Sequence, residues 1–254
     1  MYKTGIASVS FRGLADLDII NLAKTSGVDG IEWGGDVHVP AGDTAKAKTV
    51  RRETESRGLE VLSYGSYYSL GSGASFRDIL ETARELGAPV IRIWAGNSEK
   101  ARMTKEQYAE CIDEARRISM AASADGVSVA FEYHNNSLTS NACDAVELIN
   151  DIGRDNIRLY WQTEVTFDTE KNMEALKAVL PYLINIHVFN YSQGKQVLLD
   201  EADGADSWSK YMSLIKGDGK NHNFLTEFSK DGLTDSFIHD AAVLKGICRG
   251  VYGE

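Results

Sequence analysis

The chain has 254 residues, of which 43% are hydrophobic and 25% are charged, a composition typical of folded globular proteins with an apolar core. No run of residues approaches the roughly 18 apolar positions that a membrane-spanning helix needs, so a membrane is not expected as a partner. The formal net charge of −10 argues against nucleic acid as a partner, because phosphates are bound by clustered lysine and arginine.

The chain begins Met1-Tyr2-Lys3-Thr4-Gly5 and soon reaches charged residues without a long apolar stretch. This pattern does not resemble a secretory signal, so we expect a cytoplasmic protein. The three cysteines, Cys111, Cys143 and Cys248, are far apart, and each falls in a helical pattern. They are therefore expected to be buried, free thiols in a reducing compartment, and not a disulfide framework or a zinc cluster.

A glycine followed directly by an apolar run recurs along the chain. It stands at Gly27, Gly58, Gly87 and Gly126, with spacings of 31, 29 and 39 residues. One strand–helix unit takes roughly 30 residues, so the spacing indicates repeated units of this kind. Glycine suits the position after a helix, where φ is often positive. The nearly continuous apolar runs are typical of parallel strands buried on both faces.

The segments between these runs show helical periodicity. In residues 76–86 and 108–118, apolar side chains recur at spacings of three and four. Thr104 with Gln107 predicts a capping box at the start of the second of these helices, and Ser75 with Asp78 gives a weaker signal of the same kind.

Extending this count gives eight strand–helix units with no linker between them. We therefore predict an α/β protein, a single (β/α)8 TIM barrel domain over residues 1–254, whose last helix runs from about Asp235 to Tyr252. The predicted strands are centred near Gly5–Val9, Gly30–Trp33, Glu60–Tyr64, Val90–Trp94, Val127–Glu132, Ile157–Gln162, Ile184–Val188 and Phe224–Phe228.

Polar side chains stand at the ends of the last four predicted strands. Glu132, Gln162, His187 and Glu227 follow in chain order, one on each strand. In a β/α barrel the carboxyl ends of the strands face the active site, so these four are expected to meet there. Three oxygen ligands and one imidazole suit Mn²⁺, Mg²⁺, Co²⁺ or Zn²⁺, and we predict a site for one of these ions. Taken singly, each residue would more often be a solvated or hydrogen-bonded polar group.

Several phrases of the sequence resemble the xylose isomerase-like TIM-barrel superfamily of sugar isomerases and epimerases. They are Ser10-Phe11-Arg12, GVDGIEWGGD, FEYHNNSLTS, IHVFN and LTEF, and the resemblance covers essentially the whole chain. It implies a divalent metal held by Glu132, Gln162, His187 and Glu227, with Glu132 and Glu227 also acting as the acid/base pair. The family usually has aspartate where this chain has Gln162, and histidine where it has Val165.

A second branch of the same superfamily is also similar. FEYHNNSLTS and VIRIWAG resemble the corresponding segments of 3-dehydroshikimate dehydratases, and this resemblance implies that Arg92 and His134 contact the substrate. Arg92 suits a carboxylate because its planar guanidinium pairs with both oxygens, although an internal ion pair with Glu132 is an equal alternative. Trp33 and Trp161, near strand ends, are candidates for stacking on the apolar face of a sugar.

These observations together predict a metal-dependent isomerase or epimerase of a small ketose or polyol, in carbohydrate metabolism. One of the two glutamates would remove a proton next to the carbonyl, giving a metal-stabilised enediolate, and a carboxylate would return the proton. Two alternatives stay open: a dehydratase of the 3-dehydroshikimate dehydratase type, and a non-catalytic sugar-binding barrel, which Gln162 and Val165 favour. The sequence is compatible with a homo-oligomer and does not identify the substrate.

Overall fold

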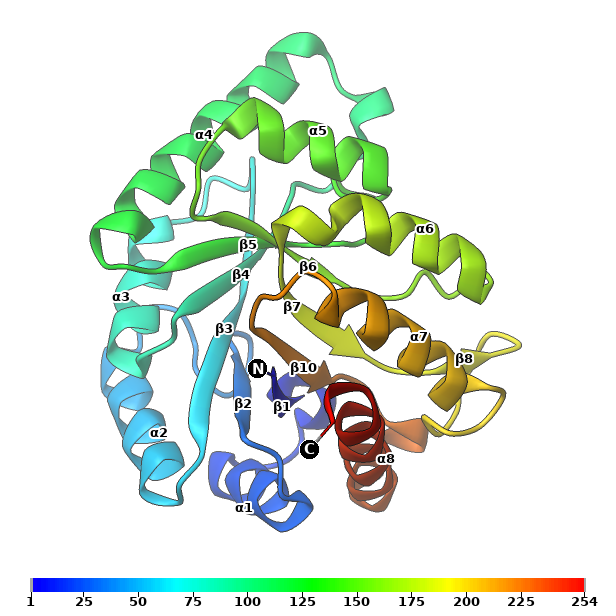
Figure 1. Ribbon diagram of the computed structural model, residues 1–254. Helices are drawn as coiled ribbons and strands as arrows, with labels where there is room; N and C mark the ends of the chain where they lie inside the picture. The colour runs from blue at the N-terminus through cyan, green and yellow to red at the C-terminus, as the bar shows by residue number, and fades with distance from the viewer. Residues whose placement is uncertain (1, 254) are drawn as a thin grey trace.

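The computed structural model of the protein describes residues 2–253, which form one closed barrel of eight parallel strands surrounded by eight α-helices (Figure 1). The predicted fold class is therefore confirmed. Met1 and Glu254 lie outside the described residues, so the extension of the domain to both ends stays a prediction. The barrel strands are β1 (Tyr2–Ala7), β2 (Gly30–Gly34), β3 (Glu60–Ser69), β4 (Val90–Trp94), β5 (Ser128–Glu132), β6 (Ile157–Trp161), β7 (Leu183–Val188) and β10 (His222–Thr226).

Each barrel strand pairs in parallel with the strands before and after it, and β10 closes the barrel by pairing with β1. The two remaining strands, β8 (Tyr191–Ser192) and β9 (Lys195–Gln196), form a small antiparallel hairpin in the loop after β7. The helices on the outside of the barrel are α1 (Asp16–Ser26), α2 (Thr44–Ser56), α3 (Phe76–Leu86), α4 (Lys105–Ala124), α5 (Ala142–Ile152), α6 (Thr169–Val179), α7 (Gly204–Lys216) and α8 (Thr234–Tyr252).

Local signals in the sequence set the helix ends. Thr104 Oγ1 accepts a hydrogen bond from the Gln107 N–H, and the Gln107 side chain accepts one from the Thr104 N–H, so the predicted capping box at the start of α4 is confirmed. Ser75 caps α3 by accepting from the Asp78 N–H. At the other end of α3, Gly87 takes φ 74°, a left-handed conformation that a side chain would strain.

The barrel has two hydrophobic layers. A small cluster fills the interior, where Leu62, Val90, Ala130, Tyr160 and Leu225 pack against one another. A much larger cluster lies between the outer face of the strands and the helices. Successive side chains of a strand point to opposite faces, so one set fills the barrel and the other set packs under the helices. This alternation decides which residues can reach the active site.

Some details differ from the sequence-based prediction. Strand β1 ends at Ala7, so Val9 falls in the 3-10 turn Ser8–Phe11, while β3 runs five residues beyond Tyr64 to Ser69. All three cysteines are free, as predicted, but Cys143 is exposed and only Cys111 and Cys248 are buried. The amphipathic helix α5 turns Cys143 away from the barrel, because its apolar stripe is formed by other residues. No helix within residues 2–253 is long and apolar enough to cross a membrane.

Asp240 links α8 to the long loop after β7. The side chain is 4% exposed and accepts a hydrogen bond of 2.8 Å from the Leu199 N–H. Burial raises the pKa of Asp240 to about 6, although the Leu199 N–H and His239 act in the opposite direction. The folded state therefore favours the neutral acid, and stability is lost as the pH rises through this range and Asp240 ionises.

We expect the variant Asp240→Asn, which is neutral at every pH, to become more stable relative to the wild type as the pH rises from 4 to 8. The relative gain in the free energy of unfolding should be about 2 to 3 kcal/mol, since each pKa unit corresponds to about 1.4 kcal/mol. The amide oxygen can still accept from Leu199. Urea unfolding of both proteins at pH 4 and pH 8 measures the difference in the free energy of unfolding between variant and wild type. The same difference at both pH values would contradict the prediction.

Candidate active site at the carboxyl rim of the barrel

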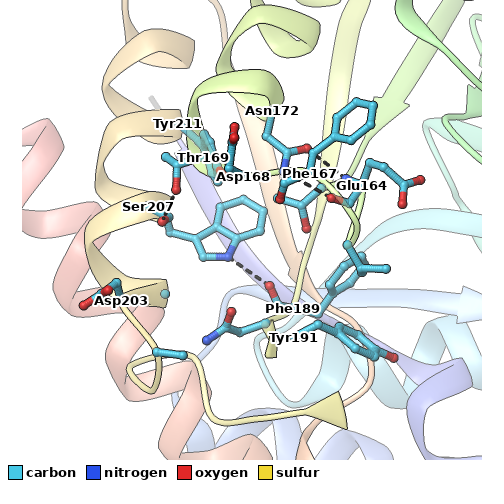
Figure 2. A pocket seen from close by; sticks show the side chains of 16 residues that line it. Glu164, Phe167, Asp168, Thr169, Asn172, Phe189, Tyr191, Asp203, Ser207 and Tyr211 are labelled. Atoms are coloured by element: carbon cyan, nitrogen blue, oxygen red, sulfur yellow. Dashed lines mark hydrogen bonds between the residues drawn. The ribbon is translucent and has the colours of Figure 1, made fainter. Parts of the chain in front are cut away.

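Two neighbouring pockets open at the carboxyl ends of the strands. The first, with a volume of about 260 Å³, lies between the loops that follow β6 and β7 (Figure 2). Its walls include Asp168, the N-cap of α6, and Trp208, whose indole N–H donates to the Phe189 carbonyl at 2.9 Å. The second pocket, of about 390 Å³, contains Glu132 and Glu227 in its lining, so the predicted chemistry belongs there.

The second pocket, called the central pocket below, draws its lining from seven of the eight barrel strands and the loops that follow them. The lining residues are Val9, Arg12, Tyr67, Arg92, Trp94, Glu132, His134, Gln162, Val165, Phe189, Tyr191, Glu227 and Phe228.

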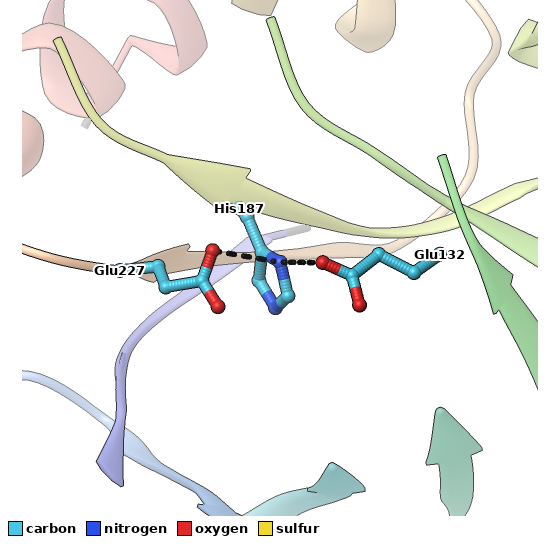
Figure 3. A group of neighbouring side chains, drawn as sticks. All are labelled: Glu132, His187 and Glu227. Carbon is cyan, nitrogen blue, oxygen red and sulfur yellow. Dashed lines mark ion pairs between the residues drawn. The ribbon is translucent and has the colours of Figure 1, made fainter. Parts of the chain in front are cut away.

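Glu132, His187 and Glu227 point toward one another (Figure 3), and the two glutamates belong to the lining of the central pocket. His187 Nδ1 lies 3.3 Å from Glu227 Oε2 and 3.9 Å from Glu132 Oε1. Gln162 Oε1 lies 3.3 Å from the same nitrogen. The structure thus brings together all four residues that the strand ends predicted. Their strands β5, β6, β7 and β10 are consecutive neighbours in the barrel, which explains why the four side chains meet.

The backbone next to Glu227 is held in an unusual conformation. Phe228 has φ 55°, in the left-handed region that a bulky side chain rarely adopts, and its N–H donates to Ser10 Oγ at 2.8 Å. Strain of this kind persists only where neighbouring contacts impose it, and it is concentrated at functional sites. Here β10 ends at Thr226, one residue before the carboxylate, and Phe228 lines the central pocket.

Glu132 is held by two donors from β4. Arg92 Nη1 donates to Glu132 Oε2 at 2.5 Å, and Trp94 Nε1 donates to the same oxygen at 2.7 Å. Arg92 is only 3% exposed, so the ion pair that the sequence offered as an alternative to a substrate contact is present. Burial alone would raise the pKa of Glu132, but Arg92 and His187 outweigh it and lower the pKa. Glu132 is therefore an anion with only Oε1 unoccupied by these donors.

Glu32 on β2 completes the buried cluster, and sequence analysis did not identify it. Its Oε1 lies 3.2 Å from His187 Nε2, and its Oε2 accepts from Ser63 Oγ at 2.7 Å. Burial raises the pKa of Glu32, but His187 and Arg92 outweigh this and lower it to about 2. The available signal was a charged residue inside the apolar run GIEW, where an unpaired charge would be costly.

The pKa values of His187 and Glu227, the other two residues of the cluster, are shifted by the neighbouring carboxylates. Burial lowers the pKa of His187, but Glu227 and Glu32 outweigh burial and raise it to about 9. Burial also raises the pKa of Glu227, and the neighbouring charge of Glu132 adds to this, while His187 opposes it. In the absence of another cation, the cluster thus draws a proton onto its imidazole.

The donor set fits a divalent cation. With the three glutamates ionised and His187 neutral, Arg92 is the one cation among them, so the cluster carries an excess of two negative charges. Atoms of Glu132, His187 and Glu227 that can bind a metal all lie within 4.8 Å of one another. Ligands at roughly 2.0 to 2.2 Å from one ion would have a similar mutual spacing. A divalent ion would therefore balance the buried charge.

The structure separates the predicted substrate contacts into two groups. Arg92 and His134 line the central pocket. Trp33 and Trp161 are fully buried and lie outside its lining: Trp33 packs near His38, and Trp161 packs against Trp208 and Tyr211 under the helices. This placement gives no support to the stacking role expected of the two tryptophans.

Other aromatic residues take the positions around the pocket. Tyr67 and Trp94 line it, with ring centroids 5.4 Å apart. Arg12 lies beside them and donates to Tyr67 OH at 2.6 Å. The lining also includes Val9, Val165, Phe189, Tyr191 and Phe228, so a large part of it is apolar. A ligand would meet both hydrogen-bonding groups and hydrophobic side chains in this pocket.

Comparison with known proteins identifies relatives with this architecture. Residues 20–243 match the model of a protein family described as xylose isomerase-like TIM barrel. A 3-dehydroshikimate dehydratase of Bacillus anthracis is 22% identical over 204 residues, which are 75% of this chain and 72% of that protein.

Solved structures share the whole barrel. A probable 3-dehydroshikimate dehydratase of Bacillus anthracis has a TM-score of 0.78 at 17% identity and covers 96% of this chain and 99% of its own. An L-ribulose 3-epimerase has a TM-score of 0.74 at 16% identity, and the match covers 99% of this chain and 96% of that chain. A xylose isomerase-like TIM barrel protein from Mycobacterium smegmatis, in complex with magnesium, has a TM-score of 0.75 at 13% identity. The match covers 99% of this chain and 98% of that chain. At these identities the likeness establishes the fold.

Proposed function

Because the chain belongs to the xylose isomerase-like TIM barrel family, we propose that it is a metal-dependent isomerase or epimerase that moves a proton next to the carbonyl group of a small sugar. The observation that carries this proposal is the buried group of Glu132, His187 and Glu227, whose two glutamates line the central pocket. Such chemistry needs a cation site and a carboxylate that can reach the substrate, and this group offers both.

Glu132, Gln162, His187 and Glu227 would hold the ion, and their donor atoms suit Mn²⁺, Mg²⁺, Co²⁺ or Zn²⁺. A bound divalent ion polarises a substrate carbonyl and makes the neighbouring C–H more acidic. The structural relative in complex with magnesium supports the proposal of a divalent ion.

Glu227 is the better candidate for the proton-transfer group. Glu132 Oε2 already accepts from Arg92 and Trp94, so a proton placed there would break two charge-assisted hydrogen bonds. Among the contacts of the described residues, Glu227 makes its one ion pair with His187. It also lines the central pocket, where a substrate could reach it. We therefore assign proton removal and return to Glu227, and the holding of the ion chiefly to Glu132 and His187.

Gln162 supplies a neutral oxygen where most relatives are expected to have a carboxylate. We expect the isosteric variant Gln162→Glu to bind Mn²⁺ about 10-fold more tightly than the wild type at pH 8, because it adds one negative charge facing the ion at unchanged length. Titration calorimetry measures both affinities. The variant Gln162→Leu serves as the control and should bind more weakly than either. Equal affinities of the wild type and both variants would remove Gln162 from the ligand set.

A second candidate function is a dehydratase that acts on a cyclic hydroxy ketone. In this reaction one C–H proton passes to Glu227, a C–O bond breaks while a C=C bond forms, and the hydroxyl takes that proton back from Glu227 and leaves as water. One observation favours it: Arg92 and Trp94 both donate to Glu132 and neither donates to Glu227, which makes Glu227 the better single base, and elimination needs one base, whereas two-base epimerisation needs two. The relative named 3-dehydroshikimate dehydratase points the same way.

One experiment separates these functions. The protein, loaded with Mn²⁺, is incubated in D₂O with a panel of ketoses and with 3-dehydroshikimate, and the products are examined by mass spectrometry and NMR. Deuterium at a carbon next to the carbonyl, with no loss of water, supports the isomerase or epimerase. Loss of water with a new conjugated ultraviolet absorbance supports the dehydratase. Absence of both bound metal and exchange would favour the non-catalytic sugar-binding barrel and overturn the proposal.

A further inference from the structure

Glu32 contacts the back of His187, on the side away from the central pocket. Gln162, Glu227 and Glu132 all approach Nδ1 of the imidazole, at 3.3, 3.3 and 3.9 Å. Among the polar contacts of residues 2–253, the one at Nε2 is with Glu32 Oε1, at 3.2 Å. The two nitrogens of one ring are thus assigned to different partners: one faces the ligand oxygens and the other faces a carboxylate on β2.

This arrangement has a definite consequence for the proton on the ring. A neutral imidazole carries one N–H and one lone pair, and the nitrogen that faces a carboxylate keeps the hydrogen. With Nε2–H donated to Glu32, the lone pair stands on Nδ1, the nitrogen that faces the ligand oxygens. A carboxylate behind a histidine ligand fixes the tautomer and the ring orientation, and it raises the basicity of the ligand.

Glu32 is itself well fixed for this task. The residue is 1% exposed, and Ser63 Oγ donates to its second oxygen at 2.7 Å, while Arg92 Nε lies 3.6 Å from the first. The ring of His187 is confined as well, since it packs edge-on against Tyr160 with centroids 5.1 Å apart. Neither partner can turn freely, so the contact between them is built into the barrel.

We propose that Glu32 is the positioning residue for His187: it holds the imidazole with Nδ1 toward the cation position, and it supplies the negative charge that the neutral Gln162 does not. This inference rests on the proposed metal-dependent function. It predicts that Glu32 controls the affinity for the ion while it touches neither the ion nor the substrate.

The test compares Mn²⁺ affinity in the wild type, in Glu32→Gln and in the control Ser63→Ala, with electron paramagnetic resonance as the measure of free Mn²⁺. Glu32→Gln keeps the size and removes the charge, and we expect an affinity about 10- to 100-fold lower. Ser63→Ala leaves the carboxylate and its contact with His187 in place, and we expect a change below about threefold, as for a lost neutral contact outside the ligand set. Thermal unfolding of the metal-free proteins verifies that each variant is folded.

A second measurement needs no variant. In protein labelled with ¹⁵N-histidine and saturated with Zn²⁺, NMR should show the His187 ring protonated at Nε2 and bound through Nδ1. Equal Mn²⁺ affinity of the wild type and Glu32→Gln, or a ring bound through Nε2, would overturn the role of Glu32. If the wild type binds neither ion, the proposed function fails first, and this outcome is distinct because it precedes any comparison of variants.

Discussion

Replacing Glu227 by glutamine is expected to reduce turnover by about 10²- to 10⁴-fold, the range typical of a lost general acid or base. Glutamine keeps the size of the side chain but cannot accept a proton from carbon. Glu227 is 6% exposed and lines the central pocket. Arg92 and Trp94 donate to Glu132 and not to Glu227, so these two donors do not compete with a proton on Glu227. The measure is the rate of deuterium exchange into the substrate that the panel identifies, at saturating Mn²⁺.

The variant Glu132→Gln provides the matched comparison. It removes a carboxylate of the same length from the other side of His187. Of the two oxygens of Glu132, Oε2 pairs with Arg92 and Oε1 faces His187 and the cation position. We therefore expect its main effect on metal affinity, with part of the turnover regained when the Mn²⁺ concentration is raised. Glu227→Gln should show no such recovery. Full activity of Glu227→Gln, or complete recovery with added metal, would show that Glu227 is not the proton-transfer group.

Most of the barrel could be predicted because parallel strands buried on both faces carry an unmistakable pattern. Short apolar runs after glycine located the strands near Gly30, Glu60 and Val90 to within a residue of their observed starts. The beginning of β1 was missed because Tyr2-Lys3-Thr4 is largely polar. These residues are strand residues because they pair with β10, a partner more than 200 positions away, and no local pattern encodes that pairing.

The tryptophans illustrate a second limit, which simple geometry could have reduced. Side chains alternate between the two faces of a strand, so neighbours along the chain cannot both face the barrel interior. Glu32 faces inward and therefore sends Trp33 outward, and Tyr160 faces inward and sends Trp161 toward the helices. By the same alternation Arg92 and Trp94 share the inner face and both reach Glu132.

The site was predicted where its residues stand at strand ends and missed where they stand within a strand. Glu132, Gln162, His187 and Glu227 were recognisable because polar residues interrupt four apolar runs at the same edge of the sheet. Glu32 was not recognised, because its meaning depends on His187, which is 155 positions away and reaches it across the barrel. A single buried charge signals that a partner exists but does not identify the partner.

Arg92 is expected to dominate the stability of this cluster in the metal-free protein. It lies between Glu132 and Glu32, at 2.5 and 3.6 Å, and these two carboxylates are 5% and 1% exposed. Burial lowers the pKa of Arg92, but the two glutamates outweigh it and raise it well above the ordinary range, so the guanidinium stays charged. Removing this charge takes away the guanidinium that pairs with both buried carboxylates, and breaking a buried pair in this way typically costs about 3 to 5 kcal/mol.

We therefore expect Arg92→Met to lower the free energy of unfolding of the metal-free protein by about 3 to 5 kcal/mol, and Arg92→Lys, which keeps the charge but loses the planar fork, to lower it by less. Urea unfolding in the presence of EDTA measures both. Saturating Mn²⁺ should restore part of the loss in Arg92→Met, because an ion that binds only the folded state stabilises it and supplies positive charge to the same carboxylates. If Arg92→Met is as stable as the wild type in EDTA, the carboxylates are neutralised by protons instead, and the excess of negative charge that favours a divalent ion in this site is absent.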